Sequence, residues 1–191
     1  TGEWAKKAIK EAKRYGGVNV AASAEDRQFT YAPPQSAWKL DSDAAYVHYT
    51  SNETIGGVEF NWVPETGTVP LVADMSSHIL SRPIDVSRYG LIYAGAQKNL
   101  GPSGVTIVII REDLLARSVE KKSTLPTMLN YGVHVENTSL YNTPPAFGIY
   151  AMGLVIKWIL DLGGLPAIAA INQRKASKLY AEIDRTGFYR G

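Results

Sequence analysis

The sequence contains no cysteine, and this absence excludes several kinds of chemistry at once. Disulfide bridges, zinc sites built on thiolates and cysteine nucleophiles all need a sulfur that these 191 residues do not supply. Histidine is also scarce, because the chain has 3, at His48, His78 and His134, far apart and without the spacing of metal ligands. We expect them to be packing or surface residues, and we expect no metal site.

Charge is neither abundant nor one-sided. The 20 basic and 18 acidic side chains leave a formal net charge of +2, and no block of Lys or Arg could follow a phosphate backbone. We therefore expect no nucleic-acid partner. With 45% hydrophobic and 20% charged residues, the composition is that of an ordinary globular domain with one sizeable core.

Long hydrophobic runs are missing as well. The longest, residues 146–160, is interrupted by glycines and by Lys157, and it falls short of the ~20 apolar residues that a membrane-spanning helix needs. We interpret it as a buried helix and expect no association with a membrane. The chain starts at Thr1, not at Met, and opens directly into a helical pattern, so we expect a segment of a longer polypeptide.

The apolar residues that are present follow helical and strand patterns. An amphipathic helix is predicted at residues 4–15, ending at Gly16-Gly17, and a polar surface excursion at residues 24–40. Short apolar runs bounded by turn-forming residues predict strands at 18–22, 45–49, 58–63, 69–73, 91–94 and 105–110. Later patterns predict helices at 112–119, 145–162 and 166–186.

The order of these elements indicates an α/β fold. The runs at 69–73, 91–94 and 105–110 do not alternate with polar residues, as expected for strands of a mostly parallel sheet covered by helices on both faces. In such sheets the chemistry collects at the carboxyl ends of the strands.

The sharpest local feature is the segment 93–104, where an apolar strand ends in small residues, then Lys98, then a Gly/Pro-rich turn. Small neighbours allow a planar ligand to lie against the backbone. If Lys98 is held largely out of water, desolvation favours the neutral amine that Schiff-base chemistry needs. The alternative is a surface lysine at a strand end.

An acid ends another apolar strand. Asp74 follows Leu71-Val72-Ala73, where an unpaired charge would be costly, so it needs a cation or hydrogen-bond donors. The pyridinium nitrogen of pyridoxal phosphate is such a cation, and an acidic partner keeps it protonated so that the ring can act as an electron sink. The alternative is a cap for the backbone amides of Met75-Ser76-Ser77.

Five motifs, in this order along the chain, resemble one family. They are Asn52-Glu53-Thr54-Ile55-Gly56-Gly57, Ala73-Asp74-Met75-Ser76-Ser77, Leu80-Ser81-Arg82-Pro83-Ile84-Asp85-Val86, Gly95-Ala96-Gln97-Lys98-Asn99 and Tyr141-Asn142-Thr143-Pro144-Pro145. Together they resemble the phosphoserine aminotransferases, which are class-V, fold-type-I enzymes that depend on pyridoxal 5'-phosphate. The resemblance covers essentially the whole chain, and several motifs in register are more specific than any single one.

The resemblance implies a three-layer α/β/α large domain with a mostly parallel mixed sheet, and a small C-terminal domain that starts near the end of this chain. It implies a cytoplasmic homodimer with active sites at the interface. The family transfers the amino group of L-glutamate to 3-phosphohydroxypyruvate, giving O-phospho-L-serine and 2-oxoglutarate in serine biosynthesis. Bacterial members also use a phosphorylated hydroxythreonine in vitamin B6 synthesis.

The resemblance also implies roles for individual residues. Lys98 carries the cofactor as a Schiff base and acts as general acid and base, and Asp74 pairs with the pyridine nitrogen. Trp4 stacks on the ring, Thr54 bonds near the ring hydroxyl and Gln97 contacts the phosphate region. Without the resemblance, a core tryptophan and a threonine that forms a local turn are the ordinary interpretations of Trp4 and Thr54.

Asn142 and Thr143 are implied to reach the phosphate of the cofactor in the neighbouring subunit. They supply polar donors on a rigid segment before Pro144-Pro145, and they can also cap the following helix.

Against the family pattern, residues 1–191 correspond to the central part of the cofactor-binding large domain. The Gly-rich phosphate loop and the basic residues for the substrate phosphate are expected before this segment, and most of the small domain, with its carboxylate-binding arginine, after it. Arg82 and Arg88 are expected to form surface or structural ion pairs.

Other functions stay open at this point. One is another class-V enzyme, of the alanine-glyoxylate aminotransferase type or a cysteine desulfurase; the desulfurase is disfavoured because it needs a cysteine. Another is a non-catalytic fragment that serves only as a folding or dimerisation core.

Overall fold

A mixed sheet forms the centre of the protein, in a computed structural model that describes residues 1–120 and 124–189. Within these residues the main sheet has the strand order β1-β4-β5-β6. Its strands are β1 (Val47–Thr50), β4 (Leu71–Asp74), β5 (Leu91–Gly95) and β6 (Thr106–Ile110). The first three run parallel and β6 runs antiparallel to β5. The predicted α/β fold with a mostly parallel mixed sheet is confirmed.

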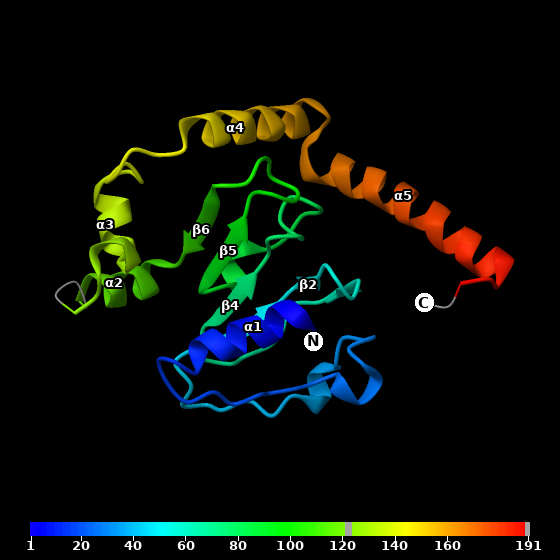
Figure 1. The fold of residues 1–191 in the computed structure, drawn as a ribbon, viewed down its shortest axis with the longest axis horizontal. Helices are drawn as coiled ribbons and strands as arrows, with labels where there is room; N and C mark the ends of the chain where they lie inside the picture. The colour runs from blue at the N-terminus through cyan, green and yellow to red at the C-terminus, as the bar shows by residue number, and fades with distance from the viewer. Residues whose placement is uncertain (121–123, 190–191) are drawn as a thin grey trace.

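Helices lie on several sides of this sheet (Figure 1). In that view α1 (Glu3–Ala12) lies on one side and α4 (Ala146–Asp161) on the other, while α2 (Glu112–Glu120) and α3 (Tyr131–Glu136) pack on each other beyond β6. The long α5 (Gly164–Thr186) extends away from the sheet. Smaller elements are the hairpin of β2 (Asn52–Glu53) and β3 (Val58–Glu59) and the 3-10 helices Glu25–Arg27, Gln35–Ala37, Val86–Arg88 and Thr127–Leu129.

The core and the polar residues occupy opposite faces of the sheet. Tyr49, Ala73 and Ile92 are paired in register on neighbouring parallel strands and are buried in the main apolar cluster. Asp74 is paired with Tyr93 one position further along, so both point to the other face, which is only partly covered. The strand register therefore places Asp74 at the sheet's carboxyl edge, outside the core.

A substitution of Ile92 tests the position of the core, because this residue lies within β5 and is only 1% exposed. Ile92→Ala should lower the free energy of unfolding by about 2–5 kcal/mol, since the buried methyl groups are lost and a cavity remains. Urea unfolding measures this, with Val20→Ala, at a position 52% exposed, as the matched control. Equal effects of the two changes would contradict the assignment.

Several short elements differ from the sequence prediction. The strand predicted at 58–63 is only Val58–Glu59, which is β3. Residues 18–22 do not form a strand: Lys39 N donates to Ala21 O and Asn19 Nδ2 donates to Lys39 O, at 2.8 Å each, but no ladder forms. Helix α3 was not predicted, because it is short and its start depends on Asn130, whose buried side chain accepts a bond from Gly132 N at 2.8 Å.

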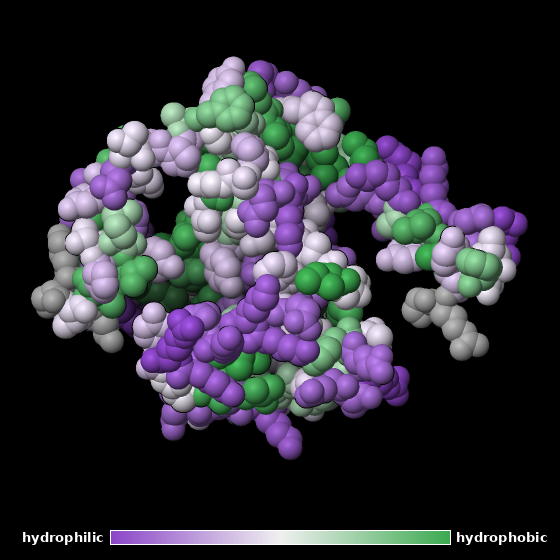
Figure 2. Space-filling view, in the orientation of Figure 1, coloured by the Kyte–Doolittle hydropathy of each residue, from purple (hydrophilic) through white to green (hydrophobic). Residues whose placement is uncertain are grey.

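Helix α4 was predicted to be buried, and this is wrong. Phe147 is 78% exposed and Leu160 66% exposed, and Figure 2 shows apolar side chains gathered over this helix. Its sequence is apolar all round, so packing on the sheet covers only part of it. Among the described residues no single helix is long and apolar enough to cross a membrane; α4 and α5 pass such a test only as a pair, bent by 86°.

Candidate active site

A pocket opens where β1, β4 and β5 end. It contains about 370 Å³ that protein atoms do not fill, including its open mouth. Trp4, Asp74, Gln97 and Lys98, all predicted site residues, line it together with Thr50 and polar neighbours. The parallel strands explain the gathering, because their carboxyl ends meet at one edge of the sheet.

Asp74 is held in a fixed orientation at this edge. Its Oδ1 accepts hydrogen bonds from the backbone N of Ser76 at 2.9 Å and from Ser76 Oγ at 2.7 Å. Ser76 Oγ in turn accepts a bond from Gly95 N at 3.0 Å, which connects the end of β4 to the end of β5. Asp74 thus bonds a nearby amide, as in the capping alternative, and also faces the pocket.

Tyr93 and His48 lie beside Asp74 on the same face. Tyr93 Oη is 3.0 Å from His48 Nε2, and the two rings are stacked. Burial raises the pKa of the Tyr93 phenol, and the charge of Asp74 and a hydrogen bond to it raise this pKa further. A neutral phenol therefore stands beside the carboxylate and can donate a hydrogen bond to it.

Stability should depend on pH through two partly or fully buried histidines. Burial is the main cause that lowers the pKa of both His48 and His78 below the ordinary 6.5. The unfolded chain then binds more protons than the folded one below about pH 6.5, so the free energy of unfolding should fall with falling pH, by up to about 1.4 kcal/mol per pH unit for each histidine. Urea unfolding at about pH 7.5 and 5.5 measures the decline. His48→Gln should make it shallower; an unchanged decline would contradict the prediction for this residue.

Lys98 brings its amine to a hydroxyl and an aromatic ring. Its Nζ donates to Thr54 Oγ1 at 2.5 Å and lies 4.9 Å from the centroid of the Trp4 ring. In the chain described here Lys98 and Gln97 are both exposed, which agrees with the alternative of a surface lysine at a strand end and not with a lysine held largely out of water. The reason is their position on the turn after β5, at the rim of the pocket.

The pocket fits the ring of pyridoxal phosphate by its chemistry. It offers a flat indole in Trp4, a carboxylate in Asp74 and an amine in Lys98. Thr50 Oγ1, whose residue is 3% exposed, has no hydrogen-bond partner within the described part of the chain, although it belongs to a residue that lines the pocket. A buried hydroxyl without a partner is costly, and a polar ligand in the pocket would remove that cost.

Asn142 and Thr143 are not brought to this pocket. Both are exposed in the link between α3 and α4, where Asn142 Nδ2 lies 3.2 Å from Met128 Sδ. The pocket of one chain is therefore lined without them.

Several site residues were not singled out from the sequence, among them Ser76 and Glu53. Ser76 bonds Asp74, and Glu53 accepts hydrogen bonds from the backbone N of Trp4 and of Ala5, at 3.1 and 2.8 Å. Both belong to the five motifs that resemble the family: Ser76 lies two residues after Asp74, and Glu53 directly precedes Thr54. No local pattern connects Glu53 to a helix 48 residues away, because only the tertiary fold brings them together.

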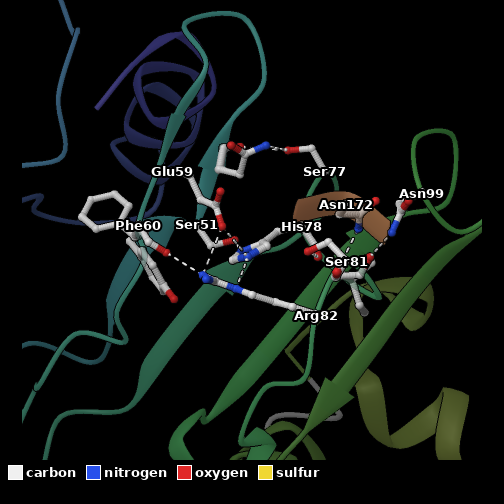
Figure 3. Close-up of polar contacts among 12 residues, drawn as sticks. Ser51, Glu59, Phe60, Ser77, His78, Ser81, Arg82, Asn99 and Asn172 are labelled. Carbon is white, nitrogen blue, oxygen red and sulfur yellow. Dashed lines mark hydrogen bonds and ion pairs between the residues drawn. The ribbon is translucent and has the colours of Figure 1, made fainter. Parts of the chain in front are cut away.

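The segment after β4 is connected to the β2–β3 hairpin by the polar network in Figure 3. His78 Nδ1 lies 3.0 Å from Ser51 Oγ, and Arg82 Nε donates to His78 Nε2 at 3.1 Å. Arg82 also pairs with Glu59 at 3.1 Å and donates to Phe60 O at 3.0 Å. The predicted structural ion pair of Arg82 is confirmed.

Further contacts connect this segment to more distant parts of the chain. Asn99, next to Lys98, donates to Ile79 O at 2.7 Å, and Asn172 of α5 donates to Ser81 O at 2.9 Å (Figure 3). The turn that carries Lys98 is thus attached to the segment that follows Asp74. Arg88 pairs with Glu65, which confirms its predicted ion pair as well.

Comparison with known proteins identifies the family of this chain. The family model of the class-V aminotransferases matches residues 1–191. The chain belongs to this family. Curated relatives named phosphoserine aminotransferase are 59% identical over 189 residues in Pseudomonas paraeruginosa and 60% identical over 189 residues in Pseudomonas fluorescens. Each alignment covers 99% of this chain and 52% of the relative, so the chain spans about half the length of the curated relatives it matches.

Solved structures of class-V aminotransferases agree with the fold. A phosphoserine aminotransferase from Bacillus circulans subsp. alkalophilus has a TM-score of 0.96 at 56% identity, over 100% of this chain and 52% of its own. A PLP-bound phosphoserine aminotransferase from Trichomonas vaginalis has a TM-score of 0.89 at 44% identity, over 97% of this chain and 52% of its own. The resemblance seen in the motifs is thereby confirmed. An alanine–glyoxylate aminotransferase from Nostoc sp., with a TM-score of 0.66 at 19% identity, shares the fold.

Proposed function

We propose that this chain is the central part of the large domain of a pyridoxal-phosphate-dependent aminotransferase. The longer protein transfers the amino group of L-glutamate to 3-phosphohydroxypyruvate and forms O-phospho-L-serine and 2-oxoglutarate, as a step of serine biosynthesis in the cytoplasm. The observation that carries the proposal is one pocket lined by Trp4, Asp74 and Lys98 at the carboxyl edge of the sheet. The names of the relatives support the choice of substrates.

The cofactor is pyridoxal 5'-phosphate, which supplies an electron-withdrawing ring when it is bound. Lys98 Nζ would hold it covalently and, as a free amine, would take and return the proton at the substrate Cα. The hydroxyl of Thr54, which accepts a bond from this amine, keeps Nζ at the mouth of the pocket. This hydrogen bond orients the amine before it reacts.

The other residues bind and orient the ring. Asp74, which is fixed by Ser76, would place a negative charge at the pyridine nitrogen and favour its protonated form. Trp4 offers a flat face for stacking, Thr54 would bond near the ring hydroxyl and Gln97 would contact the phosphate region.

We further propose a homodimer in which Asn142 and Thr143 serve the pocket of the partner subunit. Both residues are exposed and lie outside the pocket of their own chain. The neighbouring helix α4 exposes large apolar side chains (Figure 2), and a surface of this kind supports a partner. Its members are Phe147, Ile149, Tyr150, Leu154, Trp158 and Leu160.

Turnover by the full-length protein tests the reaction. With glutamate as donor, kcat/KM for 3-phosphohydroxypyruvate should exceed kcat/KM for glyoxylate by at least about 100-fold, because a site built for a charged phosphate leaves its polar groups unpaired with glyoxylate. The phosphorylated hydroxythreonine of vitamin B6 synthesis should also react. A preference for glyoxylate would move the protein to the alanine–glyoxylate type.

For the isolated 191-residue chain we propose no transamination, because the segments expected to bind the substrate phosphate and carboxylate are outside it. Titration with pyridoxal phosphate followed by borohydride tests whether it still forms a pocket. Label on Lys98 without turnover is the expected result. Turnover by the isolated chain would contradict it.

A further inference from the structure

Glu53 is the most deeply buried carboxylate near the pocket, with 1% of its side chain exposed. It forms no ion pair with a Lys or Arg side chain that the structure describes; instead Oε2 accepts from Trp4 N at 3.1 Å and Oε1 from Ala5 N at 2.8 Å. These amides belong to the first turn of α1, where a helix has donors without partners of its own and a favourable dipole for an anion. The carboxylate is therefore stabilised by the helix that carries Trp4.

The surroundings of Gly2 show how closely Glu53 approaches the start of α1. A Cβ at Gly2 would lie 2.7 Å from Glu53 Cδ and 2.8 Å from Oε2, distances that real Cβ atoms do not show. The position before α1 therefore has space for glycine alone while the carboxylate is seated against the helix. Glu53 and the start of α1 form one tightly packed unit.

The same hairpin holds the opposite side of the pocket. Thr54 follows Glu53 and accepts a bond from Lys98 Nζ, and Lys98 Nζ is 4.9 Å from the centroid of the Trp4 ring. Contacts thus run from Trp4 through Glu53 and Thr54 to Lys98 and back to Trp4. Within this ring of contacts, Glu53 is the residue that attaches the helix to the hairpin by hydrogen bonds.

We propose that Glu53 is the positioning residue that fixes the Trp4 indole over the pocket, by holding the first turn of α1 against the β2–β3 hairpin. This inference rests on the proposed function, since it concerns the face on which the cofactor ring stacks. Glu53 touches no reacting atom and acts through Trp4.

Glu53→Gln in the full-length protein tests this role. The amide keeps the shape and one acceptor oxygen, but its NH2 group faces a backbone N–H, so the helix loses one of its two bonds. After removal and retitration of pyridoxal phosphate, we expect affinity to fall about fivefold, within the range known for loss of a helix cap. The circular dichroism of the bound cofactor in the visible range should also weaken. Glu25→Gln, at an exposed position, is the matched control and should change neither.

A double-mutant cycle separates this role from a general loss of stability. In a Trp4→Leu background the stacking face is absent, so Glu53→Gln should lower the affinity for pyridoxal phosphate by less than about twofold. The loss of stability that Glu53→Gln causes, measured by urea unfolding, should persist in this background. Gly2→Ala, which pushes a methyl group into the carboxylate, should weaken cofactor binding and dichroism in the same Trp4-dependent way. It disturbs the contact from the other side, without changing Glu53 itself.

Three results would overturn the inference. Loss of stability with unchanged affinity and dichroism would leave Glu53 a structural residue only. An equal loss of affinity with and without Trp4 would mean that Glu53 does not act through the indole. If the parent protein takes up no borohydride-fixable cofactor on Lys98, the proposed function fails and the inference fails with it, which the parent sample alone reveals.

Discussion

Lys98→Ala should lower kcat of the full-length enzyme by at least about 10⁴-fold, because in the proposed mechanism one amine both anchors the cofactor and moves the proton at the substrate Cα. The variant should also lose the borohydride-fixable label. The structure places no other lysine amine that it describes against both Thr54 and the Trp4 ring. Lys7 Nζ also lies 4.5 Å from the centroid of the Trp4 ring, but Lys7 does not line the pocket.

Steady-state kinetics and mass spectrometry of the borohydride-treated protein measure these two effects. Lys10→Ala is the matched control, since Lys10 is exposed on α1, away from the pocket lining. Lys98→Arg separates charge from nucleophilicity: it keeps a cation near Thr54 but supplies no free amine, so it should be as inactive as Lys98→Ala. Normal turnover by either variant, or label retained on another lysine, would remove Lys98 from its role.

Asp74→Asn should lower kcat by about 10³-fold while leaving the fold intact, since removal of a single preorganised electrostatic group has effects of this order. The amide is nearly isosteric, and its carbonyl oxygen can still accept from Ser76 N, as Oδ1 does at 2.9 Å. What it loses is the negative charge that, in the proposed mechanism, keeps the pyridine nitrogen protonated. The loss should therefore appear in the chemical step and not in the unfolding curve.

The state of the nitrogen itself is the direct measurement. With cofactor labelled at the ring nitrogen, the ¹⁵N chemical shift should move from the protonated to the unprotonated range in Asp74→Asn. Asp41→Asn, at an exposed position outside the pocket lining, is the control and should leave the shift and kcat unchanged. A protonated nitrogen in Asp74→Asn would assign the electrostatic role to another group.

The predicted strands were most accurate where packing and local pattern agree. The runs at 69–73, 91–94 and 105–110 became β4, β5 and β6 with ends shifted by at most two residues. The run at 18–22 is also rich in valine and alanine, but it has no partner strand among the described residues and therefore forms no ladder. Strand formation depends on a neighbour, and the sequence of one segment does not contain that neighbour.

Exposure was the property predicted least well. Helix α4 was expected to be buried but exposes most of its large apolar side chains, and Lys98 is exposed, as in the alternative of a surface lysine. An apolar or small-residue pattern indicates that a surface must be covered somewhere, but it does not say by which chain or segment. The chain spans about half the length of its relatives, and we propose that a partner subunit and the remaining segments supply this cover.

By itself the sequence determined the α/β class, the order of motifs and the two chemical groups, Asp74 and Lys98, at the ends of strands. Local pattern suffices for these, because a strand end is defined by the residues around it. Only the tertiary structure decided that both groups share one pocket with Trp4, and that Glu53 holds the helix that carries this tryptophan. Those contacts join residues tens of positions apart: parallel strands bring Asp74 and the turn with Lys98 to the same edge, and the packing of α1 on the β2–β3 hairpin brings Trp4 to Glu53.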